Sequence, residues 1–489
     1  MATLVAGVLL WRRDSVKREV SATPAPPDRQ MQPLRSWVVP VGVAVVGAAT
    51  WAAITWLQDS MPAVGDRVQR AQLRVESIRT GLTIGAAVTA AFALLLAFRR
   101  QQLAERTQQA TEYDAGEKRV TELYVKAADQ LGSDKAPVRL AGLYALERLA
   151  HDNPAHRQSI VEVICAYLRM PYTPPDHESS PQPGDQSPPA DGPTPTAAST
   201  VAIGGSGEPV ADPREERQVR LAAQRILAQH LRPTTPEGKS DPLHWHTEVV
   251  LDLSEAVLVD LDFTGCHLHN ATFTRSRFIG TAQFDKATFG GIARFGEVMF
   301  SSDAWFDRVT FGGDAWFDGA TFGGDAWFDG ATFDSDVRFG KATFGGDARF
   351  GGATFGGDAR FGGATFGTIA QFDKVKFSRG AWFVEASFSG DAEFGEATFG
   401  GSTGFVEASF SRSARFGEAT FDGVTWFDGA AFGGVTWFNK ATFGGDAGFV
   451  GAEFGGDAWF VEASFSGDVR FDGATLAGAR YDGPKPAAE

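Results

Sequence analysis

The chain has 489 residues with a strongly biased composition: 57 Gly and 40 Phe, but only 6 Tyr and 5 Met. Such a bias argues against an ordinary globular fold and indicates an internal repeat. The net charge of −15 disfavours non-specific binding to nucleic acid, because the phosphate backbone repels an acidic surface. Two cysteines in different segments, Cys165 and Cys266, exclude a disulfide framework and fit a reducing compartment.

Two apolar stretches without charge lie near the N-terminus. They run from Trp37 to Leu57 and from Gly81 to Phe98, and basic residues flank them. Each is long enough to cross the hydrocarbon core of a bilayer as a helix. The sequence therefore predicts two transmembrane helices with a short loop within residues 36–98. A pair of buried helices in a soluble protein is the alternative explanation.

The distribution of Lys and Arg predicts the orientation of these helices. Six basic residues precede the first stretch, five follow the second, and four lie between them. Basic residues accumulate on the cytoplasmic side of membrane spans, so this small bias favours both termini in the cytoplasm. We therefore expect a multi-pass protein of the cell membrane, with residues 1–35 as a cytoplasmic segment.

A small α-helical module is expected over residues 99–170. Leucines at three-residue spacing indicate an amphipathic helix from Val138 to Ala150, and a second apolar pattern runs from His156 to Met170. The Asp-Asn-Pro sequence at 152–154 is a helix stop between them. Together the two helices resemble a single HEAT-like pair.

Three further segments connect or end the larger parts. Residues 171–213 are rich in Pro, Gly, Ser, Thr and Asp, so we expect a disordered linker. Residues 214–248 are predicted to contain one more helix and the lead-in to the repeat, and residues 484–489 form a short tail.

Residues 249–483 carry a five-residue repeat. Its centres are at first five residues apart, and then alternate between steps of six and five after Phe278. From Phe273 to Phe471 there are 37 such centres, and every one is Phe. The residue two positions before each of these is small, mostly Ala. A pattern kept over so many copies indicates a repeat architecture in which each unit buries its neighbours.

Short strands explain this pattern. Residues at i−2 and i of a strand point to one side, and the residue between them points to the other. Each repeat unit, with a Gly- or Asp-rich corner, would form one side of a coil with a square cross-section, and the Phe side chains would fill its interior. The extra residue in every second step, often an Asp such as Asp314 or Asp325, predicts an enlarged corner and 22 residues per coil. About eleven coils at roughly 4.8 Å each would form a rod about 50 Å long.

The small-x-Phe pattern resembles that of the pentapeptide-repeat family, over about half of the chain. The resemblance implies an all-β, right-handed quadrilateral β-helix for residues 249–483, behind an α-helical N-terminal part. Residues 130–135 and 138–149 also resemble the helical module of membrane-anchored pentapeptide-repeat proteins of actinobacteria. This second resemblance implies no particular activity.

Residues at position i−1 point outward and recur in rows along the rod. We predict a partner-binding face with aromatic and Arg anchors. Its tryptophans are Trp305, Trp316, Trp327, Trp437 and Trp459. In this register Trp305 lies beside Trp327, and Trp437 beside Trp459. The alternative is that rows of identical β-forming residues simply suit the outer surface of a β-helix.

Two groups of residues have the chemistry of metal ligands. The corner residues Asp303, Asp325 and Asp347 faintly resemble calcium-binding β-rolls, although Asp also accepts local backbone N–H bonds in turns. The second group consists of Cys266 and nearby histidines, namely His244, His246, His267 and His269. The register points Cys266 inward and its neighbours His267 and His269 outward, so the ligands do not converge. We expect no metal and no cofactor.

Two short motifs resemble catalytic signatures without their context. Residues 238–240, Gly-Lys-Ser, end like a phosphate-binding loop, but Pro233 stands where the first Gly belongs. Residues 400–404, Gly-Gly-Ser-Thr-Gly, match a nucleophile elbow, but they lie at a repeat corner. We therefore expect no catalytic residues and no enzyme activity.

The sequence favours a membrane-tethered, non-catalytic scaffold or protein-binding module with an unidentified protein partner. The alternative is a DNA mimic, because some pentapeptide-repeat proteins bind gyrase in this way. Residues 249–483 contain 32 Asp and Glu against 17 Lys and Arg, a net charge of −15 that favours mimicry. Interspersed basic residues and the predicted spans argue against it. Besides that partner we expect contact with the lipid bilayer, and no direct binding of nucleic acid.

Overall fold

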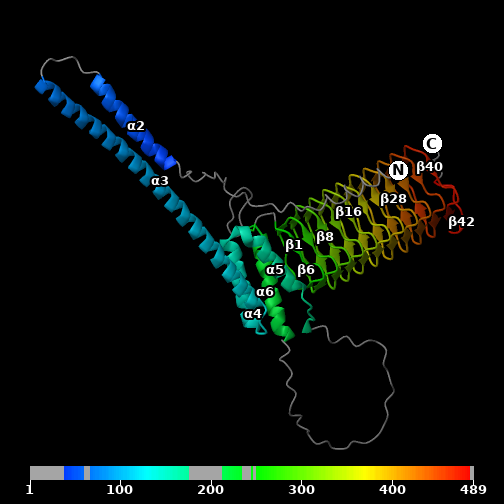
Figure 1. Cartoon of the computed structure of the whole chain (residues 1–489). Coiled ribbons are helices and arrows are strands. Elements are labelled where there is room, and N and C mark those ends of the chain that lie inside the picture. The colour runs from blue at the N-terminus through cyan, green and yellow to red at the C-terminus, as the bar shows by residue number, and fades with distance from the viewer. Residues whose placement is uncertain (1–37, 60–66, 176–211, 234–243, 246–248, 485–489) are drawn as a thin grey trace, which may run out of the picture. The chain divides into compact units, whose positions relative to one another are not determined.

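The computed structural model describes residues 38–59, 67–175, 212–233, 244–245 and 249–484 (Figure 1). The chain divides into two compact units, Met1–Gly116 and Glu117–Glu489. The predicted N-terminal segment 1–35, most of the predicted linker 171–213 and most of the tail 484–489 lie outside the described residues.

Two helices form the described part of the first unit. They are α2 (Val38–Asp59) and α3 (Arg67–Leu131), and the second continues into the next unit. A Cβ atom on Gly81 of α3 would lie 2.8 Å from Ile54 Cγ1 of α2, so the absence of a side chain allows the two helices to approach closely. Position 99, where we expected the helical module to begin, lies inside α3, which runs through it without a break.

One helical segment of the described residues, Ile78–Glu105, is long and apolar enough to cross a membrane. It contains the second predicted span, residues 81–98. The first predicted span is helical from Val38 onward, but Ile78–Glu105 is the one candidate found within the described residues, so two spans remain a prediction. Large apolar side chains are exposed on both helices, among them Trp51, Trp56 and Leu94.

The second unit begins with a helical module. After the end of α3 it contains α4 (Ala136–Asp152), a 3-10 turn η1 (Pro154–His156), α5 (Arg157–Arg169) and α6 (Pro213–Leu231). The predicted helices and the stop between them are thus present. Helix α6 packs on α4 and α5, and fully buried Leu143, Leu146, Ile160 and Val219 form part of the shared core.

Residues 251–480 form 42 short strands arranged in four sheets (Figure 1). We name the sheets by the side chains that dominate their outer surfaces. Trp/Arg face 1 contains β1 Leu251–Asp252, β4 Ala271–Thr272, β8 Ala293–Arg294, β12 Ala315–Trp316, β16 Val337–Arg338, β20 Ala359–Arg360, β24 Ala381–Trp382, β28 Thr403–Gly404, β32 Thr425–Trp426, β36 Ala447–Gly448 and β40 Val469–Arg470. Trp/Arg face 2 contains β6 Ala282–Gln283, β10 Ala304–Trp305, β14 Ala326–Trp327, β18 Ala348–Arg349, β22 Ala370–Gln371, β26 Ala392–Glu393, β30 Ala414–Arg415, β34 Thr436–Trp437 and β38 Ala458–Trp459.

The other two sheets present mostly Thr and Ser outward. Thr/Ser face 1 contains β2 Val257–Val259, β5 Arg277–Ile279, β9 Met299–Phe300, β13 Thr321–Phe322, β17 Thr343–Phe344, β21 Thr365–Phe366, β25 Ser387–Phe388, β29 Ser409–Phe410, β33 Ala431–Phe432, β37 Glu453–Phe454, β41 Thr475–Leu476 and β42 Ala479–Arg480. Thr/Ser face 2 contains β3 His267–Leu268, β7 Thr288–Phe289, β11 Thr310–Phe311, β15 Thr332–Phe333, β19 Thr354–Phe355, β23 Lys376–Phe377, β27 Thr398–Phe399, β31 Thr420–Phe421, β35 Thr442–Phe443 and β39 Ser464–Phe465.

The strand register confirms the predicted coil length. Strands pair in parallel with partners 22 residues away, as in Trp305↔Trp327, whereas the first coil has 20 residues, as in Leu251↔Ala271. The strand count corresponds to about ten turns, one fewer than estimated from the sequence. Consecutive strands visit the four sheets in turn, so the two Trp/Arg faces lie on opposite sides of the β-helix, as do the two Thr/Ser faces.

The core confirms the inward position of the repeat centres. Phe361 is fully buried, and its ring stacks on Phe339 and Phe383 with centroid distances of 4.9 and 4.7 Å. Phe372, on the opposite side of the square, meets it edge-on at 5.5 Å. Such stacked and T-shaped pairs add to the stabilisation from buried apolar area. The small residue at i−2, here Ala359, is also fully buried.

The helical module covers the N-terminal end of the β-helix. The amide of Gln224 on α6 exchanges two hydrogen bonds with the backbone of Val259, at 2.8 and 3.1 Å. The amide of Gln158 on α5 does the same with Val250, at 3.1 and 3.0 Å. Backbone groups of the first coil, which has no preceding coil to pair with, therefore find side-chain partners.

Candidate functional site

The five predicted tryptophans lie on two opposite faces. Trp316 belongs to Trp/Arg face 1, and Trp305, Trp327, Trp437 and Trp459 belong to Trp/Arg face 2. The separation follows from the register, because Trp316 is half a coil away from Trp305 and Trp327. The predicted single face is therefore divided, although each predicted pair is present: Trp305↔Trp327 and Trp437↔Trp459.

On Trp/Arg face 1, cations flank an indole ring. The guanidinium carbons of Arg294 and Arg338 lie 4.9 and 4.5 Å from the ring centroid of Trp316. Arg338 also forms an ion pair with Asp318 at 2.9 Å. Cation–π contacts of this kind hold the side chains in an ordered row. The face therefore presents a fixed arrangement of aromatic and cationic groups.

Two further tryptophans on this face were not among the predicted site residues. Trp382 and Trp426 are two coils apart, and their rings stack at 6.1 Å over Gly404, which carries no side chain between them. The recurrence of Trp at i−1 would have shown them in the sequence. The Gly between them is what allows their rings to approach.

On Trp/Arg face 2, Trp305 and Trp327 stack at 5.2 Å, and Arg349 lies 3.9 Å from the ring centroid of Trp327. Further along, Arg415 lies 5.4 Å from the centroid of Trp437. Trp459 at the C-terminal end is exposed. Both faces thus combine indole rings with Arg side chains.

The corner aspartates bind backbone of the neighbouring coil. Asp303 Oδ1 accepts from the N–H of Asp325 at 3.0 Å, and Asp325 Oδ1 accepts from the N–H of Asp347 at 2.9 Å. The accepted N–H is thus one coil away, not within the same turn as we expected. One oxygen of each carboxylate accepts a hydrogen bond from the backbone of the next coil, which gives this row a structural role.

Cys266 and the nearby histidines make separate contacts. Cys266 points inward and its thiol contacts the carbonyl of Ala228 at 3.5 Å. His244 and His267 meet edge-to-face at 6.0 Å, and His246 lies outside the described residues. Within the described part of the chain, no group of three or more His, Cys, Asp or Glu residues could hold a metal ion.

The two catalytic-like motifs have different outcomes. Residues 238–240 lie outside the described residues. Residues 400–404 form a repeat corner and strand β28, whose Thr403 is buried. No strand-to-helix turn occurs there, so this segment lacks the local fold of a nucleophile elbow.

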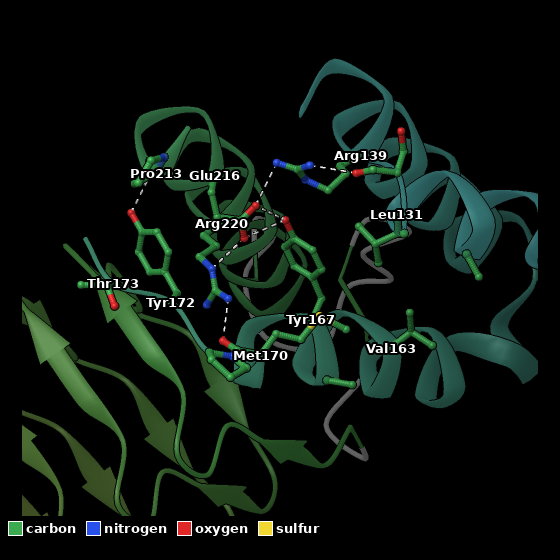
Figure 2. Close-up of a pocket in the computed structure, with 15 residues that line it drawn as sticks. Leu131, Arg139, Val163, Tyr167, Met170, Tyr172, Thr173, Pro213, Glu216 and Arg220 are labelled. Atoms are coloured by element: carbon green, nitrogen blue, oxygen red, sulfur yellow. Dashed lines mark hydrogen bonds and ion pairs between the residues drawn. The ribbon is translucent and has the colours of Figure 1, made fainter. Parts of the chain in front are cut away.

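A buried polar cluster lies in the helical module (Figure 2). The carboxylate of Glu216 on α6 accepts hydrogen bonds from the Tyr167 hydroxyl at 2.8 and 2.9 Å and from Arg220 Nε at 2.8 Å. Arg139 Nη2 on α4 lies 3.0 Å from the same carboxylate as an ion pair. Burial, together with the neighbouring Glu216, raises the pKa of Tyr167, so its hydroxyl remains a donor at neutral pH.

Arg220 uses every nitrogen of its guanidinium. Besides Glu216, it donates to the carbonyl oxygens of Leu168 at 2.9 Å and Met170 at 2.6 Å, and its guanidinium lies 4.6 Å from the ring centroid of Tyr172 (Figure 2). The side chain is 2% exposed. Arg220 therefore joins α6 to the end of α5.

A cavity of about 660 Å³ opens beside this cluster. Arg139, Tyr167, Glu216 and Arg220 form its polar wall. The remaining surface is largely apolar, with Leu131, Val163, Ala166, Met170, Pro171 and Tyr172 among its residues (Figure 2). Nothing in the sequence had indicated this site, because its residues come from four helices, α3 to α6, are separated by up to 92 positions and meet only in the folded module.

The fold is that of a four-sided parallel β-solenoid, with outward side chains arranged in rows and a helical module at its N-terminal end. Residues 263–310, 295–343, 306–354, 339–387, 383–431 and 427–475 match the family described as pentapeptide repeats (9 copies). The β-helical part of the chain, residues 263–475, belongs to the pentapeptide-repeat family. No curated protein and no solved structure matches it significantly.

Proposed function

We propose that this protein is a non-catalytic rod, tethered to a membrane, that binds a protein partner through its Trp/Arg faces. The observation that carries the proposal is the ordered row of indole and guanidinium groups on each face. Trp and Arg are the residues that most often dominate binding energy at protein interfaces. Their mutual stacking limits the side-chain entropy lost when a partner binds.

The β-helix supports this role because its backbone is rigid and keeps the outward side chains in fixed positions. Every coil is paired to the next through backbone hydrogen bonds, such as Phe361 N–H to Trp382 C=O at 2.7 Å. The Phe rings of the core stack from coil to coil, as Phe361 does on Phe339 and Phe383. A surface of this kind offers evenly spaced contact points, which suits a partner that is itself extended or repeated.

The membrane tether rests on the two N-terminal helices. Segment Ile78–Glu105 is apolar and its side chains are largely exposed, which favours a lipid environment. Helix α2 also exposes Trp51 and Trp56 and lies close to α3 at Gly81. We propose that both helices span the membrane and that both termini are cytoplasmic, in accord with the Lys and Arg bias of the sequence.

An affinity pull-down from native membranes, read by mass spectrometry, tests the binding function. Trp316→Thr and Trp327→Thr remove one indole from each face, and Thr272 shows that Thr fits this outward position. The matched control is Thr321→Ser on Thr/Ser face 1, where Ser387 and Ser409 occupy the same row. We expect a specific partner that is lost with one or both Trp variants and kept with the control. A partner retained by both Trp variants would contradict the assignment of these faces.

The DNA-mimic function has one observation in its favour, the net charge of −15 over residues 249–483. The arrangement of the charges argues against it. Arg360 pairs with Asp336 and Asp358, and Arg349 pairs with Asp347, so acidic groups on the Trp/Arg faces are partly neutralised. Inhibition of DNA gyrase supercoiling by the purified protein would support mimicry, and its absence at high protein concentration would exclude it.

A further inference from the structure

We propose that the cavity of the helical module binds a small organic acid, with its carboxylate on Arg139 and its apolar body against the α3–α5 wall. This site is separate from the Trp/Arg faces and does not depend on their function. Its volume of about 660 Å³ falls within the range of roughly 300–1,000 Å³ that is usual for small-molecule sites.

The anchor is one edge of the Arg139 guanidinium. Nη1 donates to the carbonyl of Ser133 at 2.8 Å. Nε and Nη2 form the other edge and are buried: Nε has no acceptor among the described residues, and the contact of Nη2 is its 3.0 Å ion pair with Glu216. The residue is only 6% exposed. Buried donors without acceptors are costly, and this edge is the one that binds a carboxylate with two parallel hydrogen bonds.

The charge of the cluster selects the kind of anion. Arg139 and Arg220 carry two positive charges and Glu216 one negative charge, so the polar wall has a formal net charge of +1. A buried net charge is unfavourable until a counter-charge compensates it. A monoanionic carboxylate completes the balance, whereas a dianionic phosphate would leave one excess negative charge close to Glu216.

The rest of the cavity determines the body of the ligand. Leu131, Val163, Ala166 and Met170 present apolar surface within the same cavity as Arg139. A carboxylate with almost no apolar body, such as acetate, would leave these apolar side chains exposed to water. An acid with an aromatic or branched aliphatic body would cover it and gain the corresponding hydrophobic stabilisation.

Isothermal titration calorimetry on the full chain in lipid nanodiscs tests the proposal, with empty nanodiscs as the blank. The probe is phenylbutyrate, and phenylbutanol supplies the same body without the charge. Phenyl phosphate supplies the dianion. We expect phenylbutyrate to bind roughly tenfold or more tightly than phenylbutanol, as a charge-assisted bidentate contact implies, and more tightly than phenyl phosphate.

Three variants locate the binding. Arg139→Lys keeps the charge but removes the bidentate edge and should weaken phenylbutyrate binding roughly tenfold or more. Arg148→Lys is the matched control on the same helix, because Arg148 is exposed and does not line the cavity. It should change binding by no more than about twofold. Met170→Glu places a negative charge at a cavity residue that is 56% exposed, so it should repel the acid without disturbing the fold.

Several results would overturn the inference: no binding of phenylbutyrate, equal binding of acid and alcohol, or tighter binding of phenyl phosphate. Equal effects of Arg139→Lys and Arg148→Lys would place the acid elsewhere. If Arg139→Lys does not fold, Met170→Glu decides, and unchanged binding by that variant would exclude the cavity.

Discussion

Gln224 and Val259 are joined as if they were residues of neighbouring strands. Gln224 Nε2 donates to the carbonyl of Val259 at 2.8 Å, and the N–H of Val259 donates to Gln224 Oε1 at 3.1 Å. A primary amide has the same donor and acceptor as a peptide group, so one side chain substitutes for the missing preceding coil. A solenoid needs such a terminal cap, because an open strand edge invites pairing with other chains.

Replacing Gln224 by Leu should destabilise the first coil. The side chain is buried, so the N–H and C=O of Val259 would lose their partners away from water, at a cost of about 2–4 kcal/mol. Hydrogen exchange of peptides from residues 250–270 would report the loss. Gln158→Leu is the matched control and should cost less than about 1 kcal/mol, because its bonds to Val250 are exposed and water can replace them. Equal protection of these peptides from hydrogen exchange in the Gln224 and Gln158 variants would contradict the role of Gln224 as a cap of the first coil.

The core and the surface should respond differently at adjacent positions. Phe361→Ala removes a fully buried ring from a continuous stack and should cost about 3–5 kcal/mol. Arg360→Ala removes partly exposed ion pairs with Asp336 and Asp358 and should cost at most about 1 kcal/mol. Denaturant unfolding followed by the β-sheet circular dichroism signal measures both. A larger effect of Arg360→Ala would mean that the inward and outward positions are interchanged.

The row formed by Asp285, Asp307 and Asp329 should make stability depend on pH. Burial and the two neighbouring aspartates raise the pKa of Asp307. The folded state therefore keeps a proton that the unfolded chain releases, so stability declines as the pH rises from the ordinary Asp range through the raised pKa. Above that pH Asp307 is ionised in the folded state, and the unfavourable free energy of this partly buried charge is fully present.

Asp307→Asn should remove this cost and keep the hydrogen bond to the N–H of Asp329, which Asp307 Oδ1 accepts at 3.0 Å. Asn439 already occupies the same row and accepts from the N–H of Val461 at 3.1 Å. We expect a gain of about 0.5 kcal/mol at neutral pH that fades on acidification. Thermal unfolding from pH 4 to 8 measures it. Asp334→Asn, at an exposed site outside the row, serves as the control, and an equal gain there would refute the explanation.

A cysteine at position 378 should report the membrane topology. Ser378 is exposed, whereas Cys165 and Cys266 are buried and burial raises the pKa of each thiol to about 12, so neither should react. In intact cells, Ser378→Cys should resist a membrane-impermeant maleimide and become labelled only after permeabilisation. Labelling from outside would overturn the cytoplasmic placement of the rod.

The sequence alone determined the β-helix, because its periodicity is a direct consequence of the fold. A Phe at every centre and a small residue at i−2 specify which side chains point inward, and the alternation of six and five residues specifies 22 residues per coil. The pairs Trp305↔Trp327 and Trp437↔Trp459 followed from that count. Local steps suffice here, since each coil contacts only its neighbours.

Only the tertiary structure decided how the helical module and the rod meet. Gln158 and Gln224 carry no periodic signal, and their partners lie 92 and 35 positions away. The cluster of Arg139, Tyr167, Glu216 and Arg220 likewise forms because three helices pack together. Interactions between non-repeating segments depend on how those segments pack in space, and spacing along the chain does not encode this.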